Sequence, residues 1–181
     1  IDKSKENDFF DVYEEEVFTK KVQTHINELP DSNRYSPLKV DFDFRYEQEA
    51  NTEPERRHNL VMIIAIIRMF YEVFKDWLVL PFEEDQTQCF VFERENATYK
   101  NKDKNIVKDG IHFVWPHLVC PFSFQLRVRT EMVKKLKHSG IFSKMNLYKQ
   151  HVSDVYDLGV VEGSWMMYGS CKPKHKPYKL T

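Results

Sequence analysis

The amino-acid sequence predicts an α+β fold. Segments with the apolar spacing of helices and segments with the alternation of strands follow one another in mixed order. The chain has 181 residues, of which 41% are hydrophobic and only five are glycine. A chain of this length buries about 70% of its unfolded surface, so we expect a compact unit with its own core.

The first half of the chain is predicted to contain two helices with a strand between them. Residues 9–29 place apolar side chains at roughly helical intervals, and Pro30 follows them directly. Residues 37–45 alternate apolar and charged side chains in the manner of a strand. Thr52 opens a capping box with a proline near the first turn, which predicts a helix from there to about Lys75.

Two strands are predicted in the middle of the chain. Residues 87–93 and 106–115 are rich in β-branched and aromatic side chains, which favour strands. The polar, lysine-bearing stretch 96–105 joins them. We expect this stretch to be a mobile loop.

The last third is predicted to contain one helix and two short strands. Residues 123–138 have helical spacing, and Gly140 marks the end of that helix. Residues 149–157 and 164–168 are predicted to be strands around an acidic motif that ends at Asp157.

Charge is distributed unevenly along the chain, although the net charge is only −1. Residues 1–55 carry 15 acidic and 7 basic side chains, whereas residues 101–181 carry 6 acidic and 14 basic ones. A basic region next to an acidic metal site is what a cleft that handles phosphates requires.

Several classes of protein are excluded by composition. The three cysteines are widely spaced, without a Cys-x-x-Cys pair, so neither a zinc finger nor a disulfide framework is indicated and a reducing compartment fits best. The longest apolar run, residues 60–67, is too short to cross a bilayer, and no signal-peptide pattern opens the sequence. We therefore expect no membrane association.

Asp41 and Asp43 form the most informative pattern. They lie in the segment 38–44 (LKVDFDF), where the alternation of a strand puts both carboxylates on one face and the apolar side chains on the other. Adjacent carboxylates repel one another unless a cation lies between them. The pair is therefore a candidate platform for Mg²⁺ or Mn²⁺.

Two further parts of the chain carry candidate site residues. Residues 108–116 (KDGIHFVWP) form a turn followed by a strand that opens with His112. Residues 155–157 (VYD) place two hydrophobic residues before Asp157, and residues 165–173 (WMMYGSCKP) lead from a strand into a basic turn. A single histidine beside apolar residues is more often structural, so the weight rests on the combination.

In this order, the three segments resemble the three motifs of archaeo-eukaryotic primases. The Gly-Ile-His and Tyr-Gly-Ser-x-Lys-Pro sequences look most like the primase domain of primase-helicases from large cytoplasmic DNA viruses. The matching motifs run from about residue 38 to 178. The resemblance implies an RNA-recognition-motif-like antiparallel catalytic module packed with a smaller α/β module, and residues 1–181 as the primase catalytic domain of a longer protein.

The resemblance also implies nucleotidyl transfer that uses two divalent ions. The ions lie about 3.5–4 Å apart; one activates the attacking 3′-hydroxyl and the other holds the triphosphate. We assign Asp41 and Asp43 as bridging ligands and Asp157 as the third ligand. Asp154 is the alternative for the third place; Asp157 is preferred because two hydrophobic residues precede it, as in the third motif of the family.

Five residues are candidates for binding the nucleotide. His112 is expected to donate a hydrogen bond to the triphosphate, and Gly110 to let the backbone approach a phosphate closely. The superfamily usually has serine where Gly110 stands, so a hydroxyl contact from that position is absent here. Lys108 and Lys172 are expected to add charged contacts to phosphates, and Ser170 a hydroxyl.

The predicted function is the synthesis of short primers on a single-stranded DNA template from nucleoside triphosphates, with Mg²⁺ or Mn²⁺, for viral DNA replication. Because the chain begins with Ile1 and contains no P-loop, we expect a fragment whose helicase module lies elsewhere in the parent chain. The resemblance implies a location in the host cytoplasm, at sites of viral replication.

Two other functions remain open. In a catalytically silent nucleic-acid-binding module with an RNA-recognition-like sheet, the three aspartates would only satisfy buried neighbours, although burying carboxylates without use is costly. A metal-dependent phosphohydrolase or nuclease can share the two-ion site, but it needs a group that activates water. His112 is the one clear candidate for that role.

Overall fold

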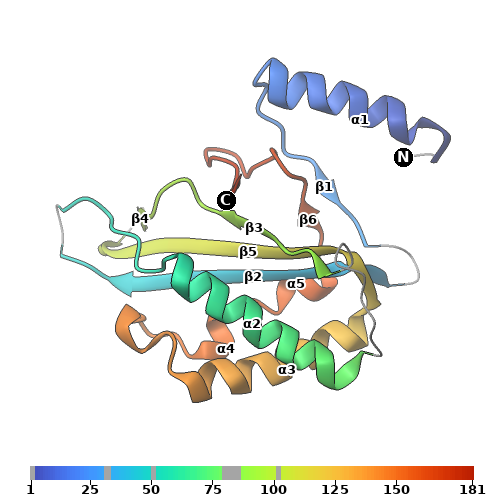
Figure 1. The fold of residues 1–181 in the computed structure, drawn as a ribbon. Helices are drawn as coiled ribbons and strands as arrows, with labels where there is room; N and C mark the ends of the chain where they lie inside the picture. The colour runs from blue at the N-terminus through green and yellow to red at the C-terminus, as the bar shows by residue number, and fades with distance from the viewer. Residues whose placement is uncertain (1–2, 31–33, 50–51, 79–86, 101–102) are drawn as a thin grey trace.

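The structure, a computed structural model, describes residues 3–30, 34–49, 52–78, 87–100 and 103–181. Two antiparallel sheets and several helices confirm the predicted α+β class (Figure 1). The smaller sheet pairs β1 (Asn27–Glu28) with β6 (Trp165–Met166). The larger sheet contains, in spatial order, β2 (Tyr35–Glu47), β5 (Asp103–Pro121), β3 (Phe90–Glu93) and β7 (Lys179–Leu180), with β4 (Thr98–Lys100) also paired to β5.

The long antiparallel ladder of β2 and β5 organises the fold. Its register places Asp41 opposite His112 and Asp43 opposite Gly110. The apolar residues that alternate with the two aspartates are fully buried. Both strands were predicted from the sequence, at 37–45 and 106–115, and both are longer than predicted because they pair with each other along their length.

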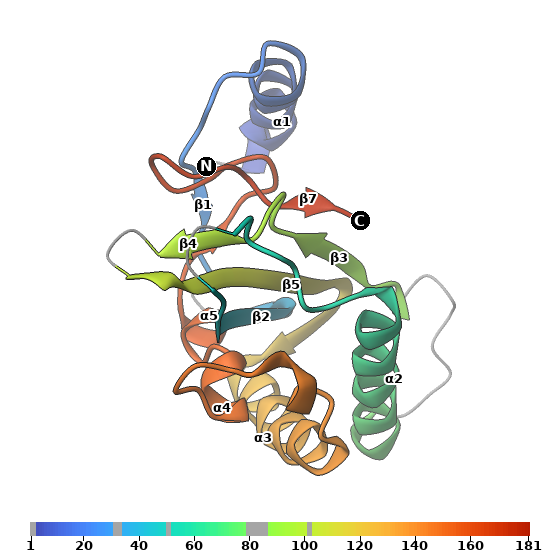
Figure 2. The same ribbon diagram turned by 90° about the vertical axis from the view of Figure 1, so that its left-hand side faces the viewer.

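Two long helices cover one face of the larger sheet (Figure 2). α2 (Leu60–Trp77) and α3 (Phe122–Ser139) bury their apolar sides against it. The rings of Phe70 and Trp115, 4.9 Å apart between centroids, join α2 to β5. α3 ends as predicted at Gly140, whose φ of 62° lies in the left-handed region that favours glycine. No helix in the described part of the chain is long and apolar enough to cross a membrane.

The predicted start of the second helix at Thr52 is wrong. Residues 53–59 form no helix, and α2 begins after Asn59, whose side chain accepts a hydrogen bond from Met62 N–H. The hydroxyl of Thr52 instead donates to the carbonyl of Glu49. Asn59 is the better N-cap because the apolar helical pattern begins immediately after it.

The predicted helix over residues 9–29 is too long. The helical part consists of the 3₁₀ turn Lys3–Lys5, α1 (Glu6–Glu14) and a π-helical turn, Glu15–Thr19. Lys21 then adopts a φ of 59° and ends the helix. This N-terminal arm lies beside the C-terminal part of the chain and away from the helical layer (Figure 1).

Two other predictions need correction. The stretch predicted as a mobile loop forms a hairpin of β4 with β5, of which residues 101–102 lie outside the described residues. The predicted strand 149–157 contains a short helix, α4 (Val152–Val155), with a single bridge from Tyr156 to Phe42. A 3₁₀ turn, Ser143–Met145, precedes α4, and α5 (Gly159–Glu162) follows it.

Candidate active site

The three sequence motifs meet on the face of the larger sheet that points away from α2 and α3. Asp41 and Asp43 of β2 lie opposite His112 and Gly110 of β5. The third motif joins them through the main chain, because Asp157 N–H donates to the carbonyl of Asp41 at 2.9 Å. The fold therefore brings the predicted motifs together.

Asp41 lies in an environment that disfavours its negative charge. Burial, together with the carboxylates of Asp43 and Asp157, raises the pKa of Asp41 to about 8, although Arg94 and Lys172 act in the opposite direction. Its Oδ1 atom is buried and accepts no hydrogen bond from the residues that the structure describes. A divalent cation would give this oxygen a partner and remove the repulsion. The donor set thus fits a hard metal ion.

The acidic side chains form an open pair and not a closed cage. Within the described ranges, no group of three or more His, Cys, Asp or Glu side chains has the arrangement of a metal site. The side chain of Asp157 is exposed, and its Oδ1 accepts a hydrogen bond from Gly159 N–H at 2.9 Å. The predicted set of three carboxylates is therefore not gathered into one site here; Mg²⁺ is commonly held by only one or two carboxylates together with water and substrate phosphates.

Asp154, the alternative third ligand, has a structural partner. Its Oδ2 accepts a hydrogen bond from His151 N–H at 2.8 Å and so caps α4. Asp157, in contrast, acts on the pKa of Asp41 through its charge. Both carboxylates accept a main-chain hydrogen bond, but the main chain of Asp157 is bonded to Asp41, so Asp157 remains the nearer candidate for the third acidic residue.

His112 contacts two aromatic rings. Its imidazole stacks on Tyr178, with centroids 3.7 Å apart and planes 10° apart, and Trp165 lies 4.6 Å away at an angle of 52°. These contacts fix the orientation of the imidazole ring.

The imidazole of His112 is uncharged near neutral pH. Burial, with the positive charges of Arg94 and Lys172, lowers the pKa of His112 to about 3. Its Nε2 lies 3.4 Å from Asp41 Oδ1, but a neutral ring makes no ion pair there. It retains one N–H group that can donate a hydrogen bond.

Arg94 and Lys172 make the surroundings of the acidic pair positive. Arg94, just after β3, places Nη2 at 3.7 Å from Asp43 Oδ1, and its Nε donates to the hydroxyl of Tyr178 at 3.0 Å. Lys172 is close enough to act on the pKa of both Asp41 and His112. A triphosphate needs such cations close to the metal ligands.

Two lysines extend this face along the strands. Lys108, half-buried, precedes Gly110 by two residues, and the pKa of Lys108 is lowered by burial. Lys39 precedes Asp41 by two residues on β2. Lys39 is only 4% exposed, its Nζ lies 5.7 Å from the centre of the Trp165 ring, and burial lowers its pKa.

Sequence reasoning missed Arg94, Tyr178 and Lys39. Lys39 stands in the same alternation as the two aspartates, so its position in the motif strand could have identified it. Arg94 and Tyr178 reach the site through the pairing of β3 with β5 and β7, for which the sequence gives no local signal. Arg45, two residues after Asp43 on the same face of β2, is exposed.

Comparison with known families gives a match over the whole chain. The family described as "C962R protein N-terminal AEP domain" matches residues 1–181. The chain belongs to this family. The resemblance to archaeo-eukaryotic primases, for which AEP stands, is thereby confirmed at the level of the domain.

A curated viral protein is also similar in sequence to this AEP domain. The protein named "Putative helicase 184R", from Invertebrate iridescent virus 6, is 26% identical over 192 residues. The aligned region covers 98% of this chain and 19% of that relative. The chain thus spans about a fifth of the length of the curated relative.

The prediction that Ser170 offers its hydroxyl to a phosphate is not supported in the AEP domain. Ser170 is buried, and its Oγ lies 2.8 Å from the hydroxyl of Tyr13 and 2.7 Å from that of Thr24. It also accepts a hydrogen bond from Ile26 N–H at 3.2 Å. The Ser170 hydroxyl therefore bonds the N-terminal part of the chain to the C-terminal segment, and it is not free to contact a phosphate. The neighbouring Gly169, with a φ of 91°, leaves space for the N-terminal arm.

A buried network of charged groups lies on the opposite face of the same strands. The guanidinium of Arg56 donates from Nε to Asp109 Oδ2 at 3.1 Å, from Nη1 to Glu93 Oε1 at 3.0 Å, and from Nη2 to the carbonyl of Arg94. His58 Nε2 lies 2.6 Å from the same oxygen of Glu93. The network joins the end of β3 to β5 directly behind the acidic pair.

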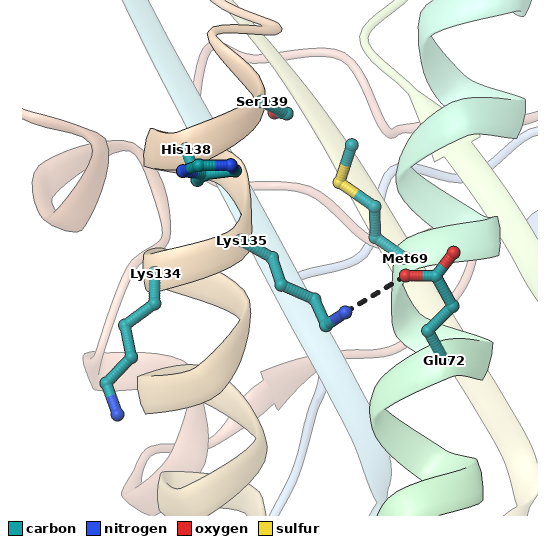
Figure 3. A pocket seen from close by; sticks show the side chains of 6 residues that line it. All are labelled: Met69, Glu72, Lys134, Lys135, His138 and Ser139. Atoms are coloured by element: carbon teal, nitrogen blue, oxygen red, sulfur yellow. Dashed lines mark hydrogen bonds and ion pairs between the residues drawn. The ribbon is translucent and has the colours of Figure 1, made fainter.

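A hollow of about 350 Å³ lies between α2 and α3, on the helical side of the AEP domain (Figure 3). Lys135 forms an ion pair with Glu72 across it at 3.0 Å. Its lining residues are Met69, Glu72, Lys134, Lys135, His138 and Ser139. None of the predicted site residues is among them, so this hollow is separate from the acidic site.

Proposed function

We propose that this AEP domain is a primase that makes short primers on single-stranded DNA by template-directed, metal-dependent nucleotidyl transfer. The observation that carries the proposal is the Asp41–Asp43 pair beside His112 and Arg94. An orphaned carboxylate oxygen suits a cation, and the surrounding positive charge suits a triphosphate.

Asp41 and Asp43 would hold Mg²⁺ or Mn²⁺, with Asp157 as a third acidic group. Bound there, the metal would lower the pKa of the attacking 3′-hydroxyl and neutralise charge on the leaving pyrophosphate. The protein residues orient the reactants. His112 donates its N–H to the triphosphate, while Arg94 and Lys172 attract the phosphates.

The proposal extends to the fold and to the parent protein. The larger sheet with α2 and α3 on one face corresponds to the RNA-recognition-like catalytic module, and the arm with β1 and β6 to the smaller module. We infer that the parent chain carries a helicase module, as the name of the iridovirus relative suggests. The motif sequences are similar to those of the primase-helicase of African swine fever virus, which favours action in the host cytoplasm.

The nuclease alternative is weakened by the electrostatics of His112. A general base works best when its pKa is near the working pH. A pKa of about 3 makes this imidazole a poor acceptor for a proton from water. The residue is better suited to donating a hydrogen bond.

Primer synthesis tests the proposal directly. The wild-type chain, given single-stranded DNA, labelled nucleoside triphosphates and Mn²⁺, is expected to produce short labelled products, whereas Asp41→Ala/Asp43→Ala is not. Template shortening by the wild type would indicate a nuclease. Template binding without product from either chain would contradict an autonomous primase and favour a binding module.

His112→Ala is expected to weaken the binding of nucleoside triphosphates by about tenfold, because the enzyme loses one hydrogen bond to a charged group. Affinity for single-stranded DNA should change by less than about twofold, since the template contacts other cations. Fluorescence titrations with each ligand separate the two effects. Equal losses in both titrations would contradict the assignment of His112 to the triphosphate.

A further inference from the structure

We propose that Tyr178 is a positioning residue of the active site, which holds His112 and Arg94 in place and for which Gly110 leaves space. The consequence for nucleotide binding rests on the proposed function. The arrangement itself does not, and it can be tested without any activity.

Tyr178 contacts both residues with one side chain. Its ring lies parallel to the imidazole of His112, with centroids 3.7 Å apart. Its hydroxyl accepts a hydrogen bond from Arg94 Nε at 3.0 Å, and Arg94 Cζ lies 5.5 Å from the centre of the ring. His112 faces Asp41 and Arg94 faces Asp43, so Tyr178 orients a partner of each aspartate.

The hydroxyl of Tyr178 also accounts for the glycine at position 110. A Cβ atom on Gly110 would lie 2.6 Å from this hydroxyl, 3.0 Å from the carbonyl oxygen of Phe42 and 3.5 Å from Arg94 Nε. The first distance is too short for any real contact. Gly110 is therefore needed to admit Tyr178, which gives a reason for the glycine that differs from close approach to a phosphate.

The C-terminal segment holds Tyr178 in this place. β7 follows Tyr178 directly and pairs with β3, with Lys179 opposite Glu93. Lys176 and Lys179 each lie 2.6 Å from a carboxylate oxygen of Glu95. These contacts fix the segment next to the strand end from which Arg94 projects.

A compensating pair of substitutions tests whether Gly110 and Tyr178 share this space. Gly110→Ala is expected to lower the melting temperature by about 5 °C, because the new methyl group meets the hydroxyl. Adding Tyr178→Phe removes that hydroxyl, so the double variant should recover at least about half of the loss. Full recovery is not expected, because the methyl group still lies close to Phe42. If the two single effects simply add, the proposal is overturned.

The stacking can be observed by nuclear magnetic resonance. A ring stacked on His112 shifts the carbon-bound protons of the imidazole upfield. Tyr178→Phe should keep this shift and Tyr178→Leu should reduce it, leaving the contribution of Trp165. Tyr168→Leu is the matched control, since the ring of Tyr168 contacts Phe92 and Phe18 instead. Unchanged His112 signals in Tyr178→Leu would contradict the proposal.

The effect on substrate should appear in KM. Tyr178→Leu is expected to raise KM for the nucleoside triphosphate by about tenfold and to change kcat and template affinity by less than about threefold. A loss confined to kcat or to template binding would overturn the positioning role. If the wild type makes no primers, the proposed function fails, while the melting and resonance measurements still decide the arrangement.

Discussion

Asp41→Asn is expected to inactivate the protein and to stabilise it. If the proposed function holds, primer synthesis should fall by about a thousandfold or more, because a catalytic metal would contribute several kcal/mol to the reaction and would lose a principal ligand. The gain in stability has the same origin, because the variant removes the carboxylate of Asp41. Burial and its acidic neighbours raise the pKa of Asp41 to about 8, so that ionising it costs the folded state free energy.

The pH dependence of this effect has a defined sign. An ordinary aspartate in the unfolded chain loses its proton near pH 3.8, whereas Asp41 in the metal-free folded protein keeps its proton up to about pH 8. The folded state binds the extra proton between these values, so this group lowers stability as the pH rises from about 4 to 8. At pH 8 the variant should therefore be more stable than the metal-free wild type, by on the order of 5 kcal/mol or roughly 10–20 °C.

Thermal unfolding at pH 4.5 and pH 8, with and without Mn²⁺, checks the prediction. Mn²⁺ should raise the melting temperature of the wild type at pH 8, since a ligand that binds the folded state stabilises it, and should have little effect on the variant. Asp154→Asn is the control, because asparagine can still cap α4. A wild type that is as stable as Asp41→Asn at pH 8 without metal would refute the argument.

Asp109→Asn is expected to cost about 3 kcal/mol of folding free energy, which corresponds to a drop of roughly 6–12 °C in melting temperature. The Asp109 side chain is fully buried, and both of its oxygens accept hydrogen bonds from Arg56. The variant would leave the guanidinium facing an amide that can donate as well as accept. Removing one partner of a buried ion pair is strongly destabilising, because the other charge stays buried without compensation.

The matched control for this prediction is again Asp154→Asn, the same chemical change at an exposed position, which should alter stability by less than about 0.5 kcal/mol. Chemical denaturation of both variants compares them under equal conditions. Similar stability of the two variants would show that the network contributes little. The Oδ1 atom of Asp109 also accepts the N–H of Gly110 at 2.9 Å, so the variant should weaken nucleotide binding as well.

The parts of the site that the sequence predicted are those with a local pattern. Asp41 and Asp43 share one face because strand side chains alternate, and His112 was identified from the short Gly-Ile-His sequence; its place opposite Asp41 comes from the pairing of β2 with β5. α3 ends at Gly140 because the chain turns there through the left-handed backbone conformation, which glycine adopts without strain. Each of these features follows from a few neighbouring residues.

The parts that were missed depend on pairing between distant segments. Arg94 and Tyr178 meet only because β3 lies between β5 and β7. Ser170 binds the N-terminal arm, which no local pattern could indicate. The start of α2 was misplaced because the Thr52 capping pattern competes with Asn59, and residues 53–59 instead carry Arg56 and His58 to the buried network.

The attachment of the N-terminal arm has a consequence during synthesis on the ribosome. Tyr13 and its partner Ser170 are 157 residues apart in the chain. At about 5–20 residues per second, the arm emerges roughly 8–30 s before its partner exists. During that time the aromatic and aliphatic side chains of the arm, including Tyr13 and Val17, have no surface to pack on. Packing of the arm is therefore one of the late steps in the folding of this domain during synthesis.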